Sequence, residues 1–251
     1  MLIDSHCHVL KNEYDSPDEV IEKSLKVVDK IIINGYNLET SKESVMLSKK
    51  YKEVYASVGI APSDVDDVTD SDINEIEKIV KNNKVVAIGE IGLDYYWTKE
   101  NKEKQIYVFK KMLDLAKKYN LPVIVHNREA TKDTYNILKE YKVKGIIHCF
   151  SGSLETAKEF VKLGFLLGIG GVVTFKNSKQ IKEVVKNIDL SSLSLETDSP
   201  YLSPEPNRGK KNDPTNLTYI VNKISEIKDI SKEEVERITT NNVCSLFDLI
   251  S

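Results

Sequence analysis

The sequence predicts an α/β protein of the TIM (β/α)8 barrel class, with a single domain over residues 1–251. Eight short apolar runs rich in β-branched residues recur along the chain, and each indicates a strand. Lysine-rich segments between them repeat apolar residues at spacings of three and four, which is typical of amphipathic helices. Strands that are apolar on both faces belong in a parallel sheet covered by helices. Eight such units exceed the usual number in an open doubly wound sheet, which remains the alternative.

The expected elements follow one another at regular intervals. The strands are expected at residues 1–9, 28–35, 53–60, 84–93, 121–126, 143–150, 164–171 and 193–198. The clearest helical patterns between them cover residues 72–83, 104–120 and 153–164. A last helix over residues 231–250 begins with a capping box from Ser231 to Glu234, and we expect it to close the barrel. No low-complexity linker, internal repeat or glycine-rich phosphate loop interrupts this order.

Composition limits the classes of function. Lys and Arg number 36 against 39 for Asp and Glu, so the net charge of −3 offers no general positive field, and nucleic-acid binding would need a local patch. Three cysteines without framework spacing favour a reducing compartment. The chain has neither a signal-peptide pattern nor an apolar run long enough to cross a bilayer, so we expect a soluble, cytoplasmic protein without membrane contact.

Histidines and acids gather at the expected strand ends. The opening stretch DSHCH places His6 and His8 on the same side of a strand, because side chains alternate with a period of two. In a barrel, the carboxyl ends of all strands share one rim, which is where such enzymes carry their chemistry. The side chains that we expect to meet there are His6, His8, Glu90, His126, His148 and Asp198.

This set predicts a metal site. Imidazole and carboxylate ligands without a thiolate cluster suit zinc, manganese or a similar divalent ion, and six such groups can hold two ions if one acid bridges them. Glu90 suits that bridge because a carboxylate has two oxygens. Taken singly, Glu90 is as readily explained by an ion pair with a lysine as by metal binding, and Asp198 by capping of a turn. For the whole set, six independent structural roles would have to coincide, so metal binding is the better interpretation. By strand alternation, Cys7 and Cys149 should turn away from the histidines beside them.

The motifs DSHCH, GEIGLDYY, PVIVHNREA, HCFSGS, GGVVTFKN, LSLETDSPYLSP and NRGKKNDP closely resemble those of the TatD-type metal-dependent deoxyribonucleases of the amidohydrolase superfamily. Their order and spacing span the chain. The resemblance implies a TIM-barrel hydrolase that uses two divalent ions (Mg, Mn or Zn) on DNA. By the same resemblance, His6, His8, Glu90 and Asp198 would bind one ion, and Glu90, His126 and His148 the other. One departure is Ala61, which stands where the family usually has a histidine after the third strand.

The expected reaction is hydrolysis of DNA phosphodiester bonds by two-metal activation of water, with Asp198 and Glu90 as catalytic residues. Asp198 would help to deprotonate the attacking water. A metal pair in a barrel mouth accepts a single strand more readily than an intact duplex, so we expect exonucleolytic action on single-stranded or frayed ends. We also expect the protein to be a monomer. The expected phosphate contacts are Arg128, Arg208 and Lys210.

Several alternatives remain open at this stage. Arg128 would equally form an ion pair with Glu129 or Asp133, and the basic loop would equally be a solvated charge run. Trp97 offers a surface for base stacking or packs as a rim aromatic. The same site would hydrolyse a carbonyl ester or amide, such as an aminoacyl ester on tRNA, although Glu90 in place of a carbamylated lysine favours phosphoesters. A binding protein that keeps an inherited site is the third possibility.

Overall fold

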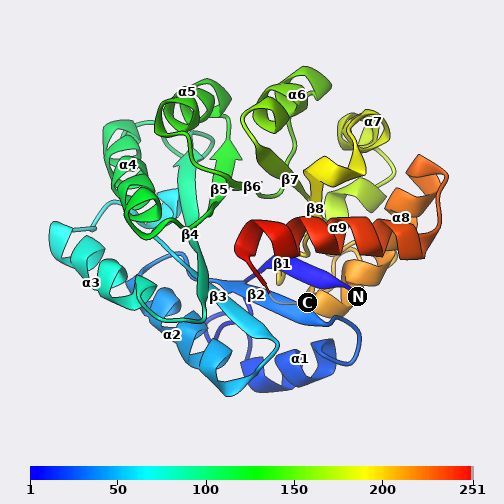
Figure 1. Cartoon of the computed structure of the whole chain (residues 1–251), viewed down its shortest axis with the longest axis horizontal. Coiled ribbons are helices and arrows are strands. Elements are labelled where there is room, and N and C mark those ends of the chain that lie inside the picture. Colours follow the sequence, from blue (N-terminus) through cyan, green and yellow to red (C-terminus); the bar gives the residue numbers. More distant parts are fainter. Residues whose placement is uncertain (250–251) are drawn as a thin grey trace. The chain divides into compact units, whose positions relative to one another are not determined.

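The computed structural model describes residues 1–249 and contains one eight-stranded sheet in the order β1 to β8 (Figure 1). All pairings with a determined register are parallel. The strands are β1 (Ile3–Cys7), β2 (Lys30–Asn34), β3 (Val54–Val58), β4 (Val85–Asp94), β5 (Val123–Arg128), β6 (Gly145–Ile147), β7 (Phe165–Ile169) and β8 (Leu193–Leu195). Each of the eight expected strands is present.

Helices alternate with these strands. They are α1 (Pro17–Ser24), α2 (Leu38–Lys50), α3 (Asp70–Val80), α4 (Lys102–Tyr119), α5 (Thr131–Tyr141), α6 (Leu154–Lys162), α7 (Lys179–Asn187), α8 (Leu217–Lys228) and α9 (Lys232–Phe247). Short 3-10 turns lie at η1 (Pro62–Asp64), η2 (Gly171–Thr174), η3 (Leu190–Ser192) and η4 (Pro214–Asn216). The strand and helix order confirms the predicted TIM (β/α)8 class.

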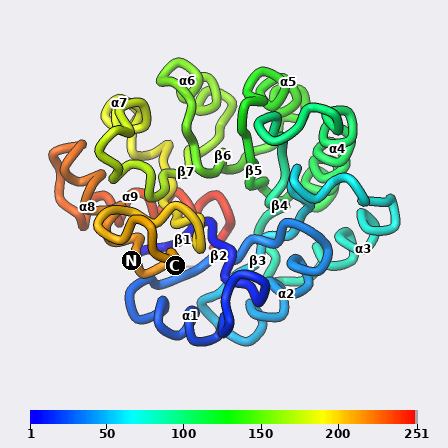
Figure 2. Tube along the Cα trace, turned by 180° about the vertical axis from the view of Figure 1, so that it is seen from behind, coloured from blue at the N-terminus to red at the C-terminus, as the bar shows by residue number. Residues whose placement is uncertain are grey.

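The chain divides into two compact units. The terminal unit comprises Met1–Ile33 together with the chain from His148 onward, and the middle unit comprises Asn34–Ile147. Figure 2 traces both from behind. One domain over residues 1–251 stays a prediction, and its last two residues lie outside the described part.

In the terminal unit, the two ends of the sheet meet. Ser5 Oγ on β1 donates to the carbonyl of Leu195 on β8 at 2.9 Å. Helix α9 packs on both strands, and its Asn242 side chain donates to the carbonyls of Leu190 and Leu193 (Figure 1). Ser231 caps α9 by accepting from the Glu234 backbone, as the sequence predicts, whereas residue 250 of the expected helix is outside the described residues.

In the middle unit, β4 and β5 form the most extended pair. Helix α4 covers β4 and buries Val108, Phe109 and Met112 completely. The register sets Gly92 beside His126 and Asp94 beside Arg128, at the carboxyl ends of both strands. A Cβ on Gly92 would lie 2.0 Å from the His126 carbonyl oxygen, so only glycine allows this approach. The packing therefore fixes which side chains emerge together at this end.

Candidate metal centre

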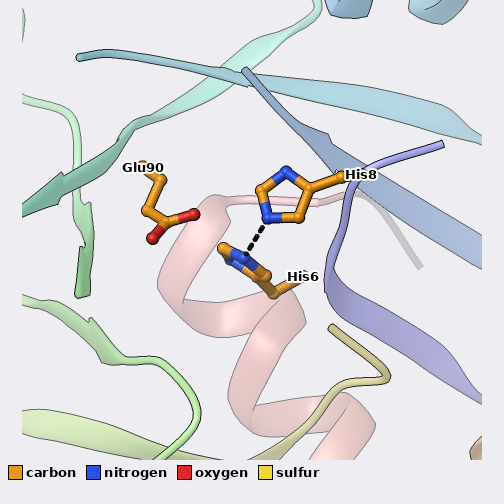
Figure 3. Close-up of side chains that lie close together, drawn as sticks. All are labelled: His6, His8 and Glu90. Carbon is orange, nitrogen blue, oxygen red and sulfur yellow. Dashed lines mark hydrogen bonds between the residues drawn. The ribbon is translucent and has the colours of Figure 1, made fainter. Parts of the chain in front are cut away.

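The terminal unit brings His6, His8 and Asp198 together. His6 is the penultimate residue of β1 and His8 follows the strand, so the predicted alternation directs both rings to one side. Their Nε2 atoms lie 3.1 Å apart (Figure 3). Asp198 Oδ1 lies 3.6 Å from Nε2 of His6 and 3.7 Å from Nε2 of His8. The His6 and His8 side chains are almost entirely buried, and that of Asp198 is 12% exposed.

The backbone holds Asp198 in this position although its conformation is uncommon. Asp198 follows β8 with φ at 53°, in the left-handed region. Its N–H donates to the His6 carbonyl at 3.0 Å, and the His8 N–H donates to the Ser199 carbonyl at 2.7 Å. These two bonds lock the turn after β8 against the end of β1, so the carboxylate cannot relax away from the imidazoles.

Asp4 stabilises the turn that carries Asp198 through hydrogen bonds with Thr197. Its carboxylate accepts hydrogen bonds from the Thr197 backbone at 3.0 Å and the Thr197 hydroxyl at 2.5 Å. Burial raises the pKa of Asp4 from 3.8 to about 8, against the opposing effect of the Thr197 hydrogen bonds. Asp4 is thus a structural brace for the Asp198 turn.

His148 completes this half of the site. It lies directly after β6, and its ring stacks on His6 with 4.0 Å between centroids and 15° between planes. His6, His148 and Asp198 each offer a donor atom, and these three atoms lie within 4.8 Å of one another. Two stacked imidazoles and a carboxylate buried at one point form a set of ligands suited to a divalent cation.

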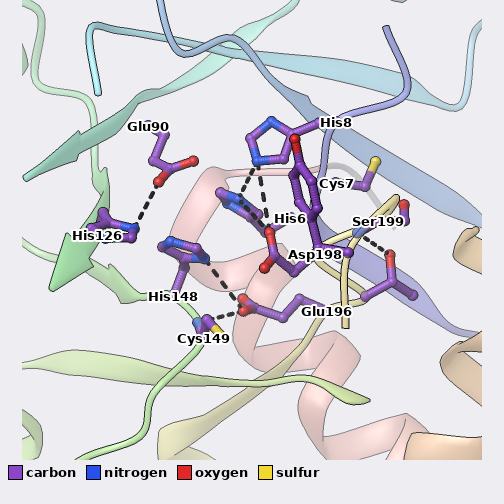
Figure 4. Close-up of polar contacts among 12 residues, drawn as sticks. His6, Cys7, His8, Glu90, His126, His148, Cys149, Glu196, Asp198 and Ser199 are labelled. Carbon is purple, nitrogen blue, oxygen red and sulfur yellow. Dashed lines mark hydrogen bonds and ion pairs between the residues drawn. The ribbon is translucent and has the colours of Figure 1, made fainter. Parts of the chain in front are cut away.

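Glu196 is a participant that the sequence analysis missed (Figure 4). It is fully buried, and its Oε1 accepts from the Cys149 backbone at 2.5 Å and lies 3.6 Å from His148 Nδ1. Its Oε2 has no hydrogen-bond partner among the described residues. The sequence signal for Glu196 is an acid that ends the apolar run LSL, two residues before the predicted ligand Asp198. Glu196 sets the position of the His148 loop.

The two neighbouring cysteines behave differently. Cys7 is fully buried on β1 and its thiol contacts the Ile32 carbonyl at 3.5 Å, so it is a packed thiol, as expected. For Cys149 the alternation argument was wrong, because β6 ends at Ile147 and Cys149 has a positive φ of 46° outside any strand. Its contribution is the backbone N–H that it offers to Glu196.

The middle unit places Glu90 and His126 side by side. Glu90 lies on β4 and His126 on β5, and Glu90 Oε1 is 3.0 Å from His126 Nδ1 (Figure 4). The other ring nitrogen, Nε2, is 2.9 Å from Asp94 Oδ2. Burial would raise the pKa of Asp94, but hydrogen bonds from His126 and the Tyr96 backbone outweigh it and lower that pKa. The sequence analysis did not select Asp94, whose carboxylate orients the His126 ring through its contact with Nε2.

Both halves fit metal binding on the spacing of their donor atoms. Ligand atoms about 2.1 Å from one ion lie about 3.0 to 3.4 Å apart in octahedral or tetrahedral geometry. The His6–His8 separation of 3.1 Å and the Glu90–His126 separation of 3.0 Å both match. The carboxylate of Asp94 behind His126 is the outer partner that histidine ligands usually have. The identity of the ions and the bridging role of Glu90 stay predictions.

Arg128 does not form either of the ion pairs considered from the sequence. Asp133 instead binds Lys102 at 2.7 Å and the Tyr95 hydroxyl at 2.9 Å. The Arg128 guanidinium stacks on the Tyr96 ring, 3.7 Å from its centroid, and lies 5.4 Å from the Trp97 ring. The Arg128 side chain thus lies against these two rings and is exposed to solvent.

The basic loop after β8 has a mixed character. Arg208 lies over the Phe175 ring at 4.4 Å, and the Lys211 amine donates to the Glu13 carbonyl. The Asn212 side chain is buried and donates to the carbonyls of Thr197 and Tyr201, which ties the loop to the Asp198 turn. Lys210 is exposed. The loop is thus partly a brace for the site, a role that the sequence analysis did not foresee.

Ala61, which stands where the family resemblance leads us to expect a histidine, is buried before η1, and its N–H donates to the Tyr36 carbonyl at 2.8 Å.

No helix in the described part of the chain is long and apolar enough to span a membrane.

A (β/α)8 fold with clustered histidines and carboxylates at its strand ends defines a metal-dependent hydrolase of the barrel type. The family model for TatD-related DNases matches residues 3–248, and the chain belongs to the TatD family. It is similar to the metal-dependent hydrolase YabD of Bacillus subtilis (strain 168), with 44% identity over 98% of this chain and 99% of that protein.

Two further relatives agree with this assignment. The metal-dependent hydrolase BU355 of Buchnera aphidicola is 38% identical over 99% of both chains. The crystal structure of YJJV, a TatD homologue from Escherichia coli, superposes with a TM-score of 0.91 at 30% identity and covers 99% of this chain and 98% of its own. These matches confirm the predicted family and fold, and the assignment to metal-dependent hydrolases.

Proposed function

We propose that this protein is a divalent-metal-dependent deoxyribonuclease that hydrolyses phosphodiester bonds at single-stranded or frayed DNA ends. The observation that carries the proposal is the buried convergence of His6, His148 and Asp198 within 4.8 Å. The family supports DNA as the substrate, since its model describes TatD-related DNases. We further propose that the protein acts as a monomer and in the cytoplasm, where its cysteines would stay reduced.

In this proposal the residues that would hold two divalent ions are His6, His8, Glu90, His126, His148 and Asp198, and Glu90 would serve both ions. When bound, the ions supply Lewis acidity and lower the pKa of a water molecule. Asp198 accepts a proton from the attacking water at Oδ2, since its Oδ1 faces His6 and His8. Asp94 keeps the His126 ring in one orientation through their 2.9 Å contact.

The substrate contacts are proposed from charge and exposure. The N–H edges of Arg128 donate to a phosphate oxygen while its face remains stacked on Tyr96. Arg208 and Lys210 contact the strand at further phosphates. We expect the double variant Arg208→Ala with Lys210→Ala to bind DNA more weakly and with a smaller salt dependence. Unchanged affinity and salt slope would remove both residues from the substrate path.

The test of the function is turnover of 5′-labelled and 3′-labelled single-stranded DNA by chelator-stripped protein with Mg²⁺, Mn²⁺ or Zn²⁺ restored. Metal-dependent cleavage is expected, and the Glu90→Ala variant should lack it. The labelled products give the polarity of an exonuclease. If a metallated sample cleaves no DNA but hydrolyses an aminoacyl ester or a cyclic amide, the phosphodiesterase proposal is wrong and the carbonyl-ester hydrolase takes its place.

A further inference from the structure

Three side chains of the middle unit form an exposed stack beside the Glu90–His126 pair. The aromatic–arginine stack consists of Tyr96, Trp97 and Arg128. Trp97 is 75% exposed and Tyr96 is 49% exposed, which is uncommon for such large apolar rings. The Tyr96 and Trp97 rings meet edge to face at 4.9 Å, and the Arg128 Cζ lies over the Tyr96 ring, 3.7 Å from its centroid.

The backbone holds this stack in place. The Tyr96 N–H donates to Asp94 Oδ1 at 2.9 Å, and the Tyr95 N–H donates to the Arg128 carbonyl at 2.9 Å. Asp94 and Arg128 are register partners on β4 and β5. The stack therefore begins at the ends of the same two strands that carry Glu90 and His126. Arg128 is only two residues, about 7 Å along an extended strand, beyond His126.

Core packing does not account for the exposed rings. Of the three consecutive aromatics, Tyr95 is the packed one: it is 7% exposed and its hydroxyl binds Asp133. Burial and the neighbouring Asp133 carboxylate raise the pKa of Tyr95, so its hydroxyl stays a neutral donor. Trp97 keeps three quarters of its surface in solvent, and its absence would cost the core little. A ligand with a flat apolar face would cover the exposed surface of Trp97.

We propose that the aromatic–arginine stack is a base-binding platform that takes the unpaired nucleobase next to the phosphate being cleaved. This inference rests on the proposed nuclease function and specifies how a strand end is chosen. Every nucleobase has a π face, so the platform accepts any sequence. In an intact duplex both faces of a base are covered by its neighbours. The platform thus favours single-stranded and frayed ends, and the exposed Arg128 guanidinium would donate to the adjoining phosphate.

A binding experiment tests the platform separately from cleavage. Trp97 is the only tryptophan in the chain, so the intrinsic tryptophan fluorescence reports this position alone. The full-length protein, with chelator present to prevent cleavage, is titrated with a short oligodeoxyadenylate and with an abasic strand of the same length. We expect quenching by the first strand and much less by the second. Equal responses to both strands would overturn the proposal, because they would place only backbone phosphates near Trp97.

Kinetics of variants provide the second arm. Stacking on an aromatic side chain contributes about 1–3 kcal/mol per base, which corresponds to about 5- to 150-fold in affinity. Trp97→Ala should raise KM for the oligonucleotide by a factor in this range and leave KM for the abasic strand unchanged, and Trp97→Phe should restore most of the loss. The matched control is Tyr107→Ala, an exposed aromatic on α4, which should not alter either value.

The two arms separate the two proposals. Quenching by the oligodeoxyadenylate without any metal-dependent cleavage would uphold the platform as a base-binding site and overturn the nuclease. Cleavage with the same KM in Trp97→Ala and the unaltered protein would uphold the nuclease and overturn the platform.

Discussion

The two groups of ligand-type residues differ in how far solvent reaches their histidines. In the terminal unit, the side chains of His6, His8 and His148 are at most 5% exposed. In the middle unit, His126 is 24% exposed and is followed by the open stack of Tyr96, Trp97 and Arg128. The carboxylates do not share this difference, since Asp198 is 12% exposed and Glu90 of the middle unit is 9% exposed. The histidines of the terminal unit are enclosed, whereas His126 and the aromatic residues that follow β4 are open to solvent.

In the proposed function, this difference would separate two tasks. Charged groups that are enclosed interact more strongly and keep their geometry during a reaction, which suits the residue that moves a proton. Groups at an open edge can meet substrates of different sequence, which suits positioning. We therefore expect substitutions in the terminal unit to affect turnover and stability, and those around His126 to affect binding of metal and substrate.

The largest effect is expected from Asp198→Asn. General base catalysis contributes about 10²–10⁴ in rate, and the amide cannot accept the proton, so kcat should fall by a factor in this range. The fold should persist because the backbone bonds of residue 198 remain. Turnover, metal content and a thermal melt are measured together. Turnover close to that of the unaltered protein in a fully metallated sample would remove the catalytic role of Asp198.

The next effect concerns the outer partner of His126. Asp94→Asn keeps the shape of the side chain but removes the negative charge that faces His126 Nε2 at 2.9 Å. Loss of such a partner usually weakens metal affinity about 10- to 100-fold. Competition between the protein and a chromophoric chelator for Zn²⁺ measures the change. Glu196→Gln provides the comparison in the terminal unit, and there the 3.6 Å separation from His148 predicts a smaller loss of affinity.

A third prediction tests how tightly the terminal half is packed. A Cβ on Gly168 would lie 2.2 Å from Glu196 Oε2 and 3.0 Å from the His148 Cα, so Gly168→Ala forces buried atoms to move. Overpacking of this kind lowers the free energy of unfolding by about 1–3 kcal/mol, or the Tm by about 2–10 °C.

The control for this variant is Gly170→Ala, directly after the same strand. The nearest atom to its Cβ would be the Glu196 carbonyl oxygen at 3.6 Å, and its φ of −107° suits any residue. Its Tm should remain close to that of the unaltered protein. Equal Tm values for the two variants would contradict the view that Glu196 is rigidly enclosed.

The smallest effect concerns the acid stability of the loop that braces Asp198. Burial would raise the pKa of Asp213, but hydrogen bonds from Lys23 and Thr215 outweigh it and hold that pKa below 3.8. The folded state therefore binds this proton less tightly than the unfolded chain. Its stabilising contribution is complete above about pH 4 and is lost as the pH falls through the folded pKa.

Thermal melts across pH measure this contribution. Asp213→Asn should lower the Tm at about pH 6, and the difference from the unaltered protein should shrink toward about pH 3. A difference that stays constant with pH would assign the effect of the substitution to the Thr215 turn instead of the charge.

The sequence by itself determined the succession of strands and the fold class, and it predicted six ligand-type residues, because these depend on local patterns. Period-two alternation placed His6 and His8 on one side, and apolar runs located each strand within a few residues. The same local rule gave the wrong reason for Cys149, because only the structure shows that β6 ends before it. Local patterns specify the type of element more reliably than the residue at which it ends.

Only the tertiary structure decided which polar groups support the ligands. Asp4 and Thr197 are separated by 193 positions, and Glu196 meets the Cys149 backbone across 47. Partners at such distances in the chain follow from strand pairing and loop closure, and no short window of sequence contains them both. The exposure of Trp97 was likewise undecided in the sequence, where an aromatic residue suits a core and a binding surface equally. The chemistry of a side chain is therefore given by the sequence, but its partners and its access to solvent depend on packing.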